Sequence, residues 1–400
     1  MRLKLILSFL AILFIYYTQA QTKVDHTFGK GIINVVAADS SWDLKFAARF
    51  QTLFIGDFSI DNNGELYDAN SNFLIRRSRF KFDGFIYHPS LTYKLEFGLS
   101  NRDIGNAVPE TNNSSRLILD AVLKWNFYKN LSIWAGQTKL PGNRERVISS
   151  GDLQFVDRSL LNSNYNIDRD VGIQIRNHHK IGKQFVIREI IAISQGEGRN
   201  VTVGNLGGYD YTARIELLPF GNFTKKGDYF GADLEREKKI KFSLGITYDM
   251  HDRAVREHGN TRNFMRTETG YFETDINTLF VDFMLKYRGF SMMGEYADKR
   301  SKDLFARGTE GELTGDFVTA GTGLNLQAGY LFPSNYEIAA RYTSITRDKD
   351  LPINNIDQFT LGGSKYFVGH KLKVQADISY AKEENTDDAV MYRMQFDLHF

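Results

Sequence analysis

The sequence predicts an antiparallel β-barrel of about sixteen strands that spans a membrane. Three observations support this prediction. Apolar and polar residues alternate with a period of two along most of the chain, no segment after residue 20 is apolar for long enough to form a spanning helix, and short and long connections take turns. In lipid, only helices and closed barrels satisfy their backbone hydrogen bonds internally. The chain is also rich in Phe (31) and Tyr (20) and poor in Pro (6), as strand-rich proteins are.

Residues 1–20 have the pattern of a secretory signal peptide. Two basic residues precede an almost unbroken apolar run, Leu5–Tyr17, and Ala20 offers a small residue for cleavage. The run is shorter than the roughly 20 residues that a spanning helix requires, which argues against a membrane helix. We expect a short periplasmic lead-in over 21–40 and the barrel over 41–400.

Two strands show the alternation most clearly. Every second residue from Val390 to Phe400 is apolar, and Ser41–Asp57 follows the same pattern. Lys45 and Arg49 orient this first strand, because a basic side chain on the lipid face at mid-bilayer costs about 2–4 kcal/mol. We expect strands at 41–57, 73–87, 91–99, 117–125, 131–139, 170–176, 183–194, 210–218, 239–249, 274–287, 290–297, 317–331, 336–345, 358–368, 371–381 and 390–400. Only Phe185–Ile193 is too uniformly apolar for its faces to be assigned.

The connections give a second, independent signal. We expect short links at 88–90, 128–130, 288–289, 333–335 and 369–370, and long links at 60–72, 102–115, 140–168, 195–209, 251–273 and 299–316. Outer-membrane barrels have short periplasmic turns and longer outer loops, so both termini should be periplasmic. One link disagrees, because 219–238 falls where a turn is expected but is long and charged. A soluble β-sandwich or propeller is the alternative, and it would leave the outward apolar rows unexplained.

Charge and cysteine content exclude several classes of protein. Removing the signal peptide lowers the count of Lys and Arg from 50 to 48, which equals the 48 Asp and Glu. The mature chain is therefore formally neutral, and no basic field indicates nucleic-acid binding. Cysteine is absent, which excludes disulfides and thiolate metal sites.

Motifs in the middle of the chain point to a known family. The sequence is GQTKLPG at 136–142, RERVISS at 144–150, LQFVDRSL at 153–160 and DRDVGIQ at 168–174. In this order, these motifs resemble the phosphate-selective porin O and P family, in the form found in Bacteroidota. Further stretches that fit are RRSRFKFDG at 76–84 with YKLEF at 93–97, AR at 213–214 before LPFG at 218–221, and YRGFS at 287–291 before GEY at 294–296.

The resemblance implies an outer-membrane porin of sixteen strands, usually a homotrimer. It also implies that the third long loop, here 140–168, folds into the barrel as a constriction. The aromatic Phe400 would be the signal that the barrel assembly machinery recognises.

The inward faces of the first five strands are more basic than acidic. The candidate pore-lining bases are Lys45, Arg49, Arg77, Arg79, Lys81, Lys94, Lys124 and Lys139. Only four acids share these faces: Asp43, Asp83, Glu96 and Asp120. A pore selects ions through its lining charges, and guanidinium groups on adjacent strands can bind phosphate oxygens in pairs. Alternatively, these charges pair across strands and only make the lumen polar.

The candidate constriction loop is more balanced in charge. Its candidate residues are Arg144, Glu145, Arg146, Asp157 and Arg158, and the whole loop holds three bases and four acids. Such a loop is not an obvious anion trap. We expect passive diffusion of small hydrophilic solutes through the outer membrane, with anions such as phosphate as candidates and the selectivity open.

The sequence was also compared with two other classes of function, a barrel anchor and an enzyme. The chain could be a barrel anchor or accessory subunit of an outer-membrane secretion, uptake or motility complex. An enzyme is not expected, because no nucleophile, metalloprotease or phosphate-binding motif occurs. His251 and His258 could bind a metal, but their spacing is a weak signal, and we expect no metal or cofactor.

Overall fold

The computed structural model describes residues 28–61 and 63–400. The predicted signal peptide and the first part of the lead-in lie outside the described residues. In the described part of the chain, no helix is both long enough and apolar enough to cross a membrane.

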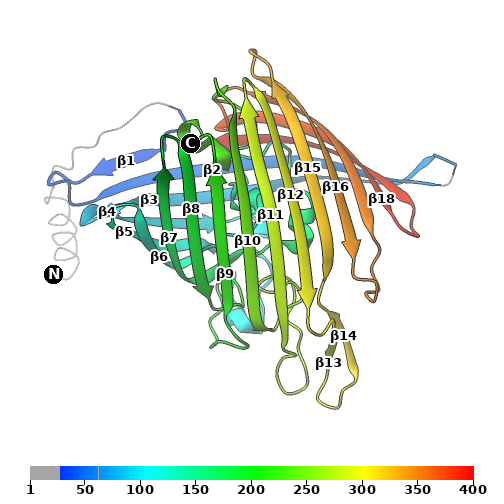
Figure 1. Cartoon of the computed structure of the whole chain (residues 1–400). Coiled ribbons are helices and arrows are strands. Elements are labelled where there is room, and N and C mark those ends of the chain that lie inside the picture. The colour runs from blue at the N-terminus through cyan, green and yellow to red at the C-terminus, as the bar shows by residue number, and fades with distance from the viewer. Residues whose placement is uncertain (1–27, 62) are drawn as a thin grey trace, which may run out of the picture.

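The described residues form a closed antiparallel barrel of sixteen strands (Figure 1). The barrel strands are β2 (Asp43–Ile60), β3 (Leu66–Ile86), β4 (His88–Gly98), β5 (Ile118–Tyr128), β6 (Leu131–Lys139), β7 (Arg169–Ile181), β8 (Phe185–Ser194), β9 (Asp210–Leu218), β10 (Lys241–Ala254), β11 (Thr274–Tyr287), β12 (Phe290–Ser301), β15 (Gly321–Leu331), β16 (Tyr336–Arg347), β17 (Ile356–Tyr366), β18 (Leu372–Glu383) and β19 (Asp388–His399). The ring closes where β19 pairs with β2, from Arg49 opposite His399 to Ile60 opposite Asp388. The predicted fold class is confirmed.

A short strand in the predicted lead-in extends the sheet. Strand β1 (Ile33–Val36) pairs with Asp43–Phe46 of β2, on the same edge as β19 and before the point where pairing with β19 begins at Arg49. The Phe400 N–H donates to the Ala48 carbonyl at 2.9 Å, and the rings of Phe400 and Phe28 lie 6.3 Å apart. The start of the described chain and its end therefore meet at the end of the barrel that carries the short turns.

The alternation of short and long links holds, with three corrections to the expected ranges. The short link expected at 88–90 is wrong, because β4 begins at His88 and only Tyr87 lies between β3 and β4. The expected loop at 60–72 is wrong, because β2 and β3 pair out to Ile60 opposite Leu66 and leave only 61–65 as a link. This part of the hairpin is held by backbone pairing and has no continuous apolar face. The alternation of apolar and polar residues therefore could not predict it. The expected strand 317–331 is two elements, since β14 (Leu313–Phe317) pairs with β13 (Phe305–Arg307) in a hairpin outside the barrel.

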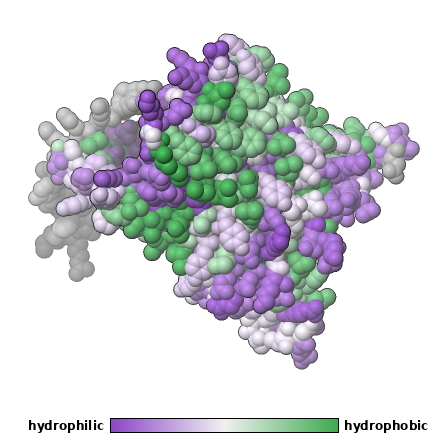
Figure 2. Space-filling view, in the orientation of Figure 1, coloured by the Kyte–Doolittle hydropathy of each residue, from purple (hydrophilic) through white to green (hydrophobic). Residues whose placement is uncertain are grey.

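The outer surface of the barrel is apolar. Rows of Phe, Leu, Ile and Tyr side chains face outward, and Figure 2 shows their green area between purple, polar regions on the visible face. Strand β8 contributes to this surface although it lacks polar alternation. Ile191 and Ile193 are exposed on its outer side, while Val186 and Ile190 are buried on its inner side. Both faces are apolar because the inner face of β8 contacts chain inside the barrel.

Short helical turns lie in the links between strands. They are α2 (Asn101–Ile104), η1 (Pro109–Thr111), α3 (Arg144–Val147), α4 (Leu160–Tyr165) and η2 (Thr224–Tyr229). Two apolar clusters fill space within the barrel. One joins Leu161 and Tyr165 of α4 to wall residues such as Phe280, and the other joins Ile148 to Phe223 of the link between β9 and β10.

Candidate functional site

The segment 140–168, called here the inner segment, crosses the inside of the barrel. Arg144 bonds Asp282 of β11, and the Val156 N–H donates to Asp377 of β18 at 3.1 Å. Figure 1 shows the helical turns of this segment behind β11 and β12. The segment thus leaves β6 and reaches the opposite wall before it returns to β7.

Arg144 anchors the inner segment by charge. Its side chain is fully buried, with Nε 3.1 Å from Asp282 Oδ1 and Nη2 3.0 Å from Glu216 Oε1. Asp228 lies 3.7 Å away, and the guanidinium lies over the Tyr229 ring at 5.4 Å. A buried guanidinium is stable only where carboxylates compensate it, and here three do.

The long link 219–240, called here the turn-side link, enters the barrel from the end that carries the short turns. It meets the inner segment where the Gly231 N–H donates to the Asp152 carbonyl at 2.6 Å. Lys286 of β11 donates to the Phe230 carbonyl at 3.0 Å. The length of this link therefore has a structural reason, because it fills the barrel interior beside β11, β15 and β17.

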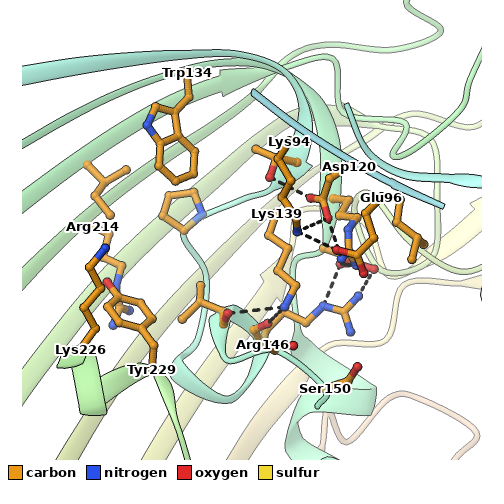
Figure 3. Close-up of a pocket in the computed structure, with 18 of the residues that line it drawn as sticks. Lys94, Glu96, Asp120, Trp134, Lys139, Arg146, Ser150, Arg214, Lys226 and Tyr229 are labelled. Carbon is orange, nitrogen blue, oxygen red and sulfur yellow. Dashed lines mark hydrogen bonds and ion pairs between the residues drawn. The ribbon is translucent and has the colours of Figure 1, made fainter. Parts of the chain in front are cut away.

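A cavity of about 1200 Å³ remains along the other wall, and it is called here the channel (Figure 3). It is lined by β3–β9 and by one side of the inner segment. Its lining includes Asn130 and Asn222 in links at the turn end, and Arg102 and Arg199 in long links at the opposite end. The channel therefore runs from one end of the barrel to the other.

Basic groups dominate the channel. Among the described residues that line it, sixteen are Lys or Arg and six are Asp or Glu. The bases are Arg76, Arg77, Arg79, Lys94, Arg102, Lys124, Lys139, Arg146, Arg158, Arg169, Arg176, Arg188, Arg199, Arg214, Lys226 and Arg393. The acids are Glu96, Asp103, Asp120, Asp157, Asp168 and Glu216.

Four of the lining charges form a network between β4, β5 and β7. Lys94 Nζ lies 2.7 Å from Glu96 and 2.8 Å from Asp120, and Arg169 Nη2 lies 3.1 Å from Asp120. Arg79 joins Glu96 at 3.2 Å. Figure 3 shows Lys94, Glu96 and Asp120 close together. These carboxylates offset bases already present, so they add no net negative charge to the channel.

A bulge in β3 aims two arginines at the inner segment. The ladder with β2 skips one residue, since Gln51 is opposite Arg77 but the next residue of β2 is opposite Ile75. Arg76 and Arg77 therefore both point inward, and they hold Asp157 at 2.7 and 3.2 Å.

The three other lining acids are paired as well. Asp103, in α2, lies 2.6 Å from Arg79; burial raises its pKa, but hydrogen bonds and charge from Arg79 lower it to about 2. Asp168 pairs with Arg146, and Glu216 pairs with Arg214 and two further arginines. Every lining carboxylate is thus neutralised by at least one base.

Seven lining bases have no carboxylate partner within the described part of the chain. They are Arg102, Lys124, Lys139, Arg158, Arg176, Arg199 and Lys226. Lys139 Nζ donates instead to the carbonyls of Arg146 and Ile148, and Arg158 donates to those of Glu145 and Ile148. Carbonyl acceptors leave the positive charge uncompensated, so the channel is electropositive.

The predicted site residues fall into two groups. Those that line the channel are Arg77, Arg79, Lys94, Lys124, Lys139, Arg146, Asp157 and Arg158. Those that lie off it are Lys45, Arg49, Lys81, Arg144 and Glu145. Arg49 is covered by the inner segment, bonding Asp397 at 2.7 Å and Ser150, and Lys81 pairs with Asp83. Glu145 is buried and accepts from the Ser159 N–H and hydroxyl.

Sequence reasoning missed the bases of the later strands and links. Arg169, Arg176, Arg188 and Arg214 lie on β7, β8 and β9, beyond the five strands whose inward faces were counted. The same alternation identifies Arg176 and Arg214. It does not identify Arg188, because the faces of β8 could not be assigned, or Arg169, which has the parity of the outward residues Val171 and Ile173. Arg199 had no such signal, because a long link has no period that assigns a side chain to the lumen.

The two histidines considered as metal ligands are buried rather than solvated. His258 Nε2 lies 2.8 Å from the Thr319 hydroxyl, and His251 is an inward residue of β10. Among the described residues, no group of three or more His, Cys, Asp or Glu side chains could hold a metal.

A closed sixteen-stranded barrel with an end-to-end charged channel is the architecture of an outer-membrane porin. The sequence profile of the phosphate-selective porin O and P family matches residues 46–398, and the chain belongs to this family. A protein of Aquifex aeolicus (strain VF5) without a functional name is 25% identical over 385 residues, covering 89% of this chain and 87% of the relative. The family and the fold are those of a channel rather than an enzyme.

Solved porins share the fold at low sequence identity. A loop-deletion mutant of OmpT from Vibrio cholerae superposes with a TM-score of 0.56 at 12% identity, covering 90% of this chain and all of the other. An anion-selective porin from Comamonas acidovorans has a TM-score of 0.53 at 11% identity with the same coverage. OmpT in a trimer form has a TM-score of 0.51 at 12% identity, again with the same coverage.

Proposed function

We propose that this outer-membrane porin conducts small anions by passive diffusion, with phosphate among the candidates. The observation that carries the proposal is the set of seven lining bases without a carboxylate partner, in a channel whose six acids are all paired. An ion that enters a narrow lumen responds to the net charge of its wall. The anion selectivity that the Comamonas porin's name states supports the same direction.

The orientation and assembly of the barrel are part of this proposal. The end with the short turns, where β1 and Phe400 lie, faces the periplasm, because outer-membrane barrels keep their short turns there. The chain assembles as a homotrimer, as the trimer form of the structurally similar OmpT suggests. Recognition of Phe400 by the assembly machinery stays a prediction.

The test neutralises bases that have no acidic partner. Changing Arg102, Arg199 and Lys226 together to Gln leaves no carboxylate unpaired, so any change in selectivity comes from the channel's net charge. We expect the chloride-to-potassium permeability ratio in a planar bilayer to fall by at least about threefold. The matched control is Arg300→Gln, which removes an exposed base outside the channel.

Two outcomes would count against the proposal. An unchanged ratio in the triple variant would show that the unpaired bases do not set the selectivity. A purified, folded barrel that stays electrically silent would favour the anchor function instead. The channel's continuity from Asn130 at one end to Arg199 at the other supports conduction.

A further inference from the structure

A tryptophan lies in the wall of the channel near its turn end. Trp134 is four residues into β6 from the turn between β5 and β6, and it lines the channel. Figure 3 shows its indole at the cavity, across from Lys226 and Tyr229. Aromatic side chains of barrels concentrate at the lipid interfaces, so an inward Trp requires a separate reason.

Two bases hold this indole between them. Lys124 Nζ lies 3.9 Å from the ring centroid, and the Arg176 guanidinium carbon lies 3.8 Å from it. Lys124 is directly opposite Trp134 on β5, and Arg176 comes from β7 on the other side of β6. Since both lie within 4 Å of one centroid, the two positive charges are less than about 8 Å apart.

On two other strands of the channel wall, β4 and β9, a base is paired with a carboxylate two residues away on the same strand. Lys94 pairs with Glu96 in this way, and Arg214 pairs with Glu216. At Arg176 the corresponding residue is Gln174, whose amide oxygen accepts from Arg176 Nη2 at 2.7 Å and from Nε at 3.1 Å. The acceptor is therefore neutral where β4 and β9 supply a charge.

Lys124, on the other side of the indole, also lacks an acidic neighbour on its own strand. The residues two positions from Lys124 on β5 are Val122 and Asn126, neither of which is acidic. The indole attracts both cations through its quadrupole but carries no net charge. Trp134 thus holds two bases in place without neutralising either, which a carboxylate at this position would do.

We propose that Trp134 is a positioning residue that holds Lys124 and Arg176 as an uncompensated pair, and that this pair binds small oxyanions, phosphates or carboxylates, at the turn end of the channel. The proposal rests on the proposed anion conduction and adds a defined site to it. Lys226 across the cavity and the amide of Asn126 in its lining supply further donors for an oxyanion. The acids that act on this pair, Asp120 and Glu216, are held by other bases, so a potassium ion would meet net positive charge there.

The test measures block of the chloride current by an added oxyanion. Inorganic phosphate and succinate are added in separate experiments, first to one side of a bilayer and then to the other. For Trp134→Leu we expect the half-blocking concentration to rise about tenfold, because the two bases lose their common support. Trp134→Phe keeps an aromatic face and should stay within about threefold of the wild type. The anion whose half-blocking concentration rises more in Trp134→Leu shows whether the site prefers phosphates or carboxylates.

A second variant keeps the proposal testable if Trp134→Leu does not fold. Gln174→Glu supplies Arg176 with the kind of carboxylate partner that Lys94 and Arg214 have, and leaves the indole in place. We expect the same loss of block, since the pair of charges is then half neutralised. Unchanged block in Gln174→Glu or Trp134→Leu, or equal loss in the Phe and Leu variants, would overturn the proposal. Cation selectivity of the wild type would instead refute the proposed function itself.

Discussion

Replacing Arg144 by Met should release the inner segment without opening the barrel. The change removes the cation that joins this segment to Glu216 of β9 and Asp282 of β11, and it leaves their carboxylates buried. Every ladder hydrogen bond between strands is untouched. The prediction therefore separates the docking of the inner segment from the stability of the barrel.

The size of the effect follows from the burial of this contact. Removing one partner of a buried ion pair costs about 3–5 kcal/mol, because the other charge is left uncompensated. Since each 1.4 kcal/mol is tenfold in an equilibrium constant, the open fraction of the segment should rise by about two to three and a half orders of magnitude. Arg214 still contacts both Glu216 and Asp282, and Arg188 still contacts Glu216, which favours the lower end of that range.

A single thiol reports the opening. The chain contains no cysteine, so Ile148→Cys creates a unique label site directly after α3, where Ile148 is 2% exposed. Its modification rate follows the open population when closing is faster than labelling. We expect labelling at least about a hundredfold faster in Arg144→Met than in the parent.

The control breaks an exposed ion pair instead of a buried one. Arg300→Met removes an arginine of the exposed pair with Asp298, a contact worth about 0–1 kcal/mol, and should change labelling less than about fivefold. Equal labelling in the Arg144 variant and the parent, with the barrel folded in both, would show that this charge cluster does not hold the inner segment.

Three further predictions concern selectivity and pH. Asp157→Asn should raise anion preference, because it frees Arg76 and Arg77 from the carboxylate they share; a lower chloride-to-potassium ratio would contradict this. Changing Arg77 and Arg79 together to Ser should shift the reversal potential toward cations, since it removes two bases and frees their carboxylates, and an unchanged potential would refute the assignment. Burial and the nearby charges of Lys299 and Arg262 lower the pKa of His258 well below 6.5. His258 then binds a proton only when the 255–273 link opens, so the docking of this link should weaken as pH falls below about 6.5. The measurement is local hydrogen exchange, which should become faster at low pH in the wild type and should lose this pH dependence in His258→Gln.

The barrel could be predicted from the sequence because its rules are local. Period-two alternation and the cost of a base in lipid orient each strand, as for Lys45 and Arg49 on β2. The faces of β8 could not be assigned in this way, because both are apolar. Ile191 lies on the outer, lipid-facing side, and Val186 packs against chain inside the barrel. The place of the turn-side link could not be predicted either, since contacts such as that of Gly231 with Asp152 join parts of the chain far apart in sequence.

The electrostatics of the channel could be predicted only in part. The basic bias of the first five strands was visible, but the neutral total of the chain and the balanced inner segment argued against an anion path. The structure shows which charges are paired with each other, and a count of charged residues cannot show this. Asp157 and Asp168 are each held by arginines, while the side chains of Lys139 and Arg158 donate to backbone carbonyls.

The most direct test of anion conduction is the reversal potential of the purified wild-type protein in a planar bilayer across a KCl gradient. The unpaired bases of the channel predict stepwise conductance with chloride more permeant than potassium. A potential of the opposite sign, with potassium more permeant, would contradict the account.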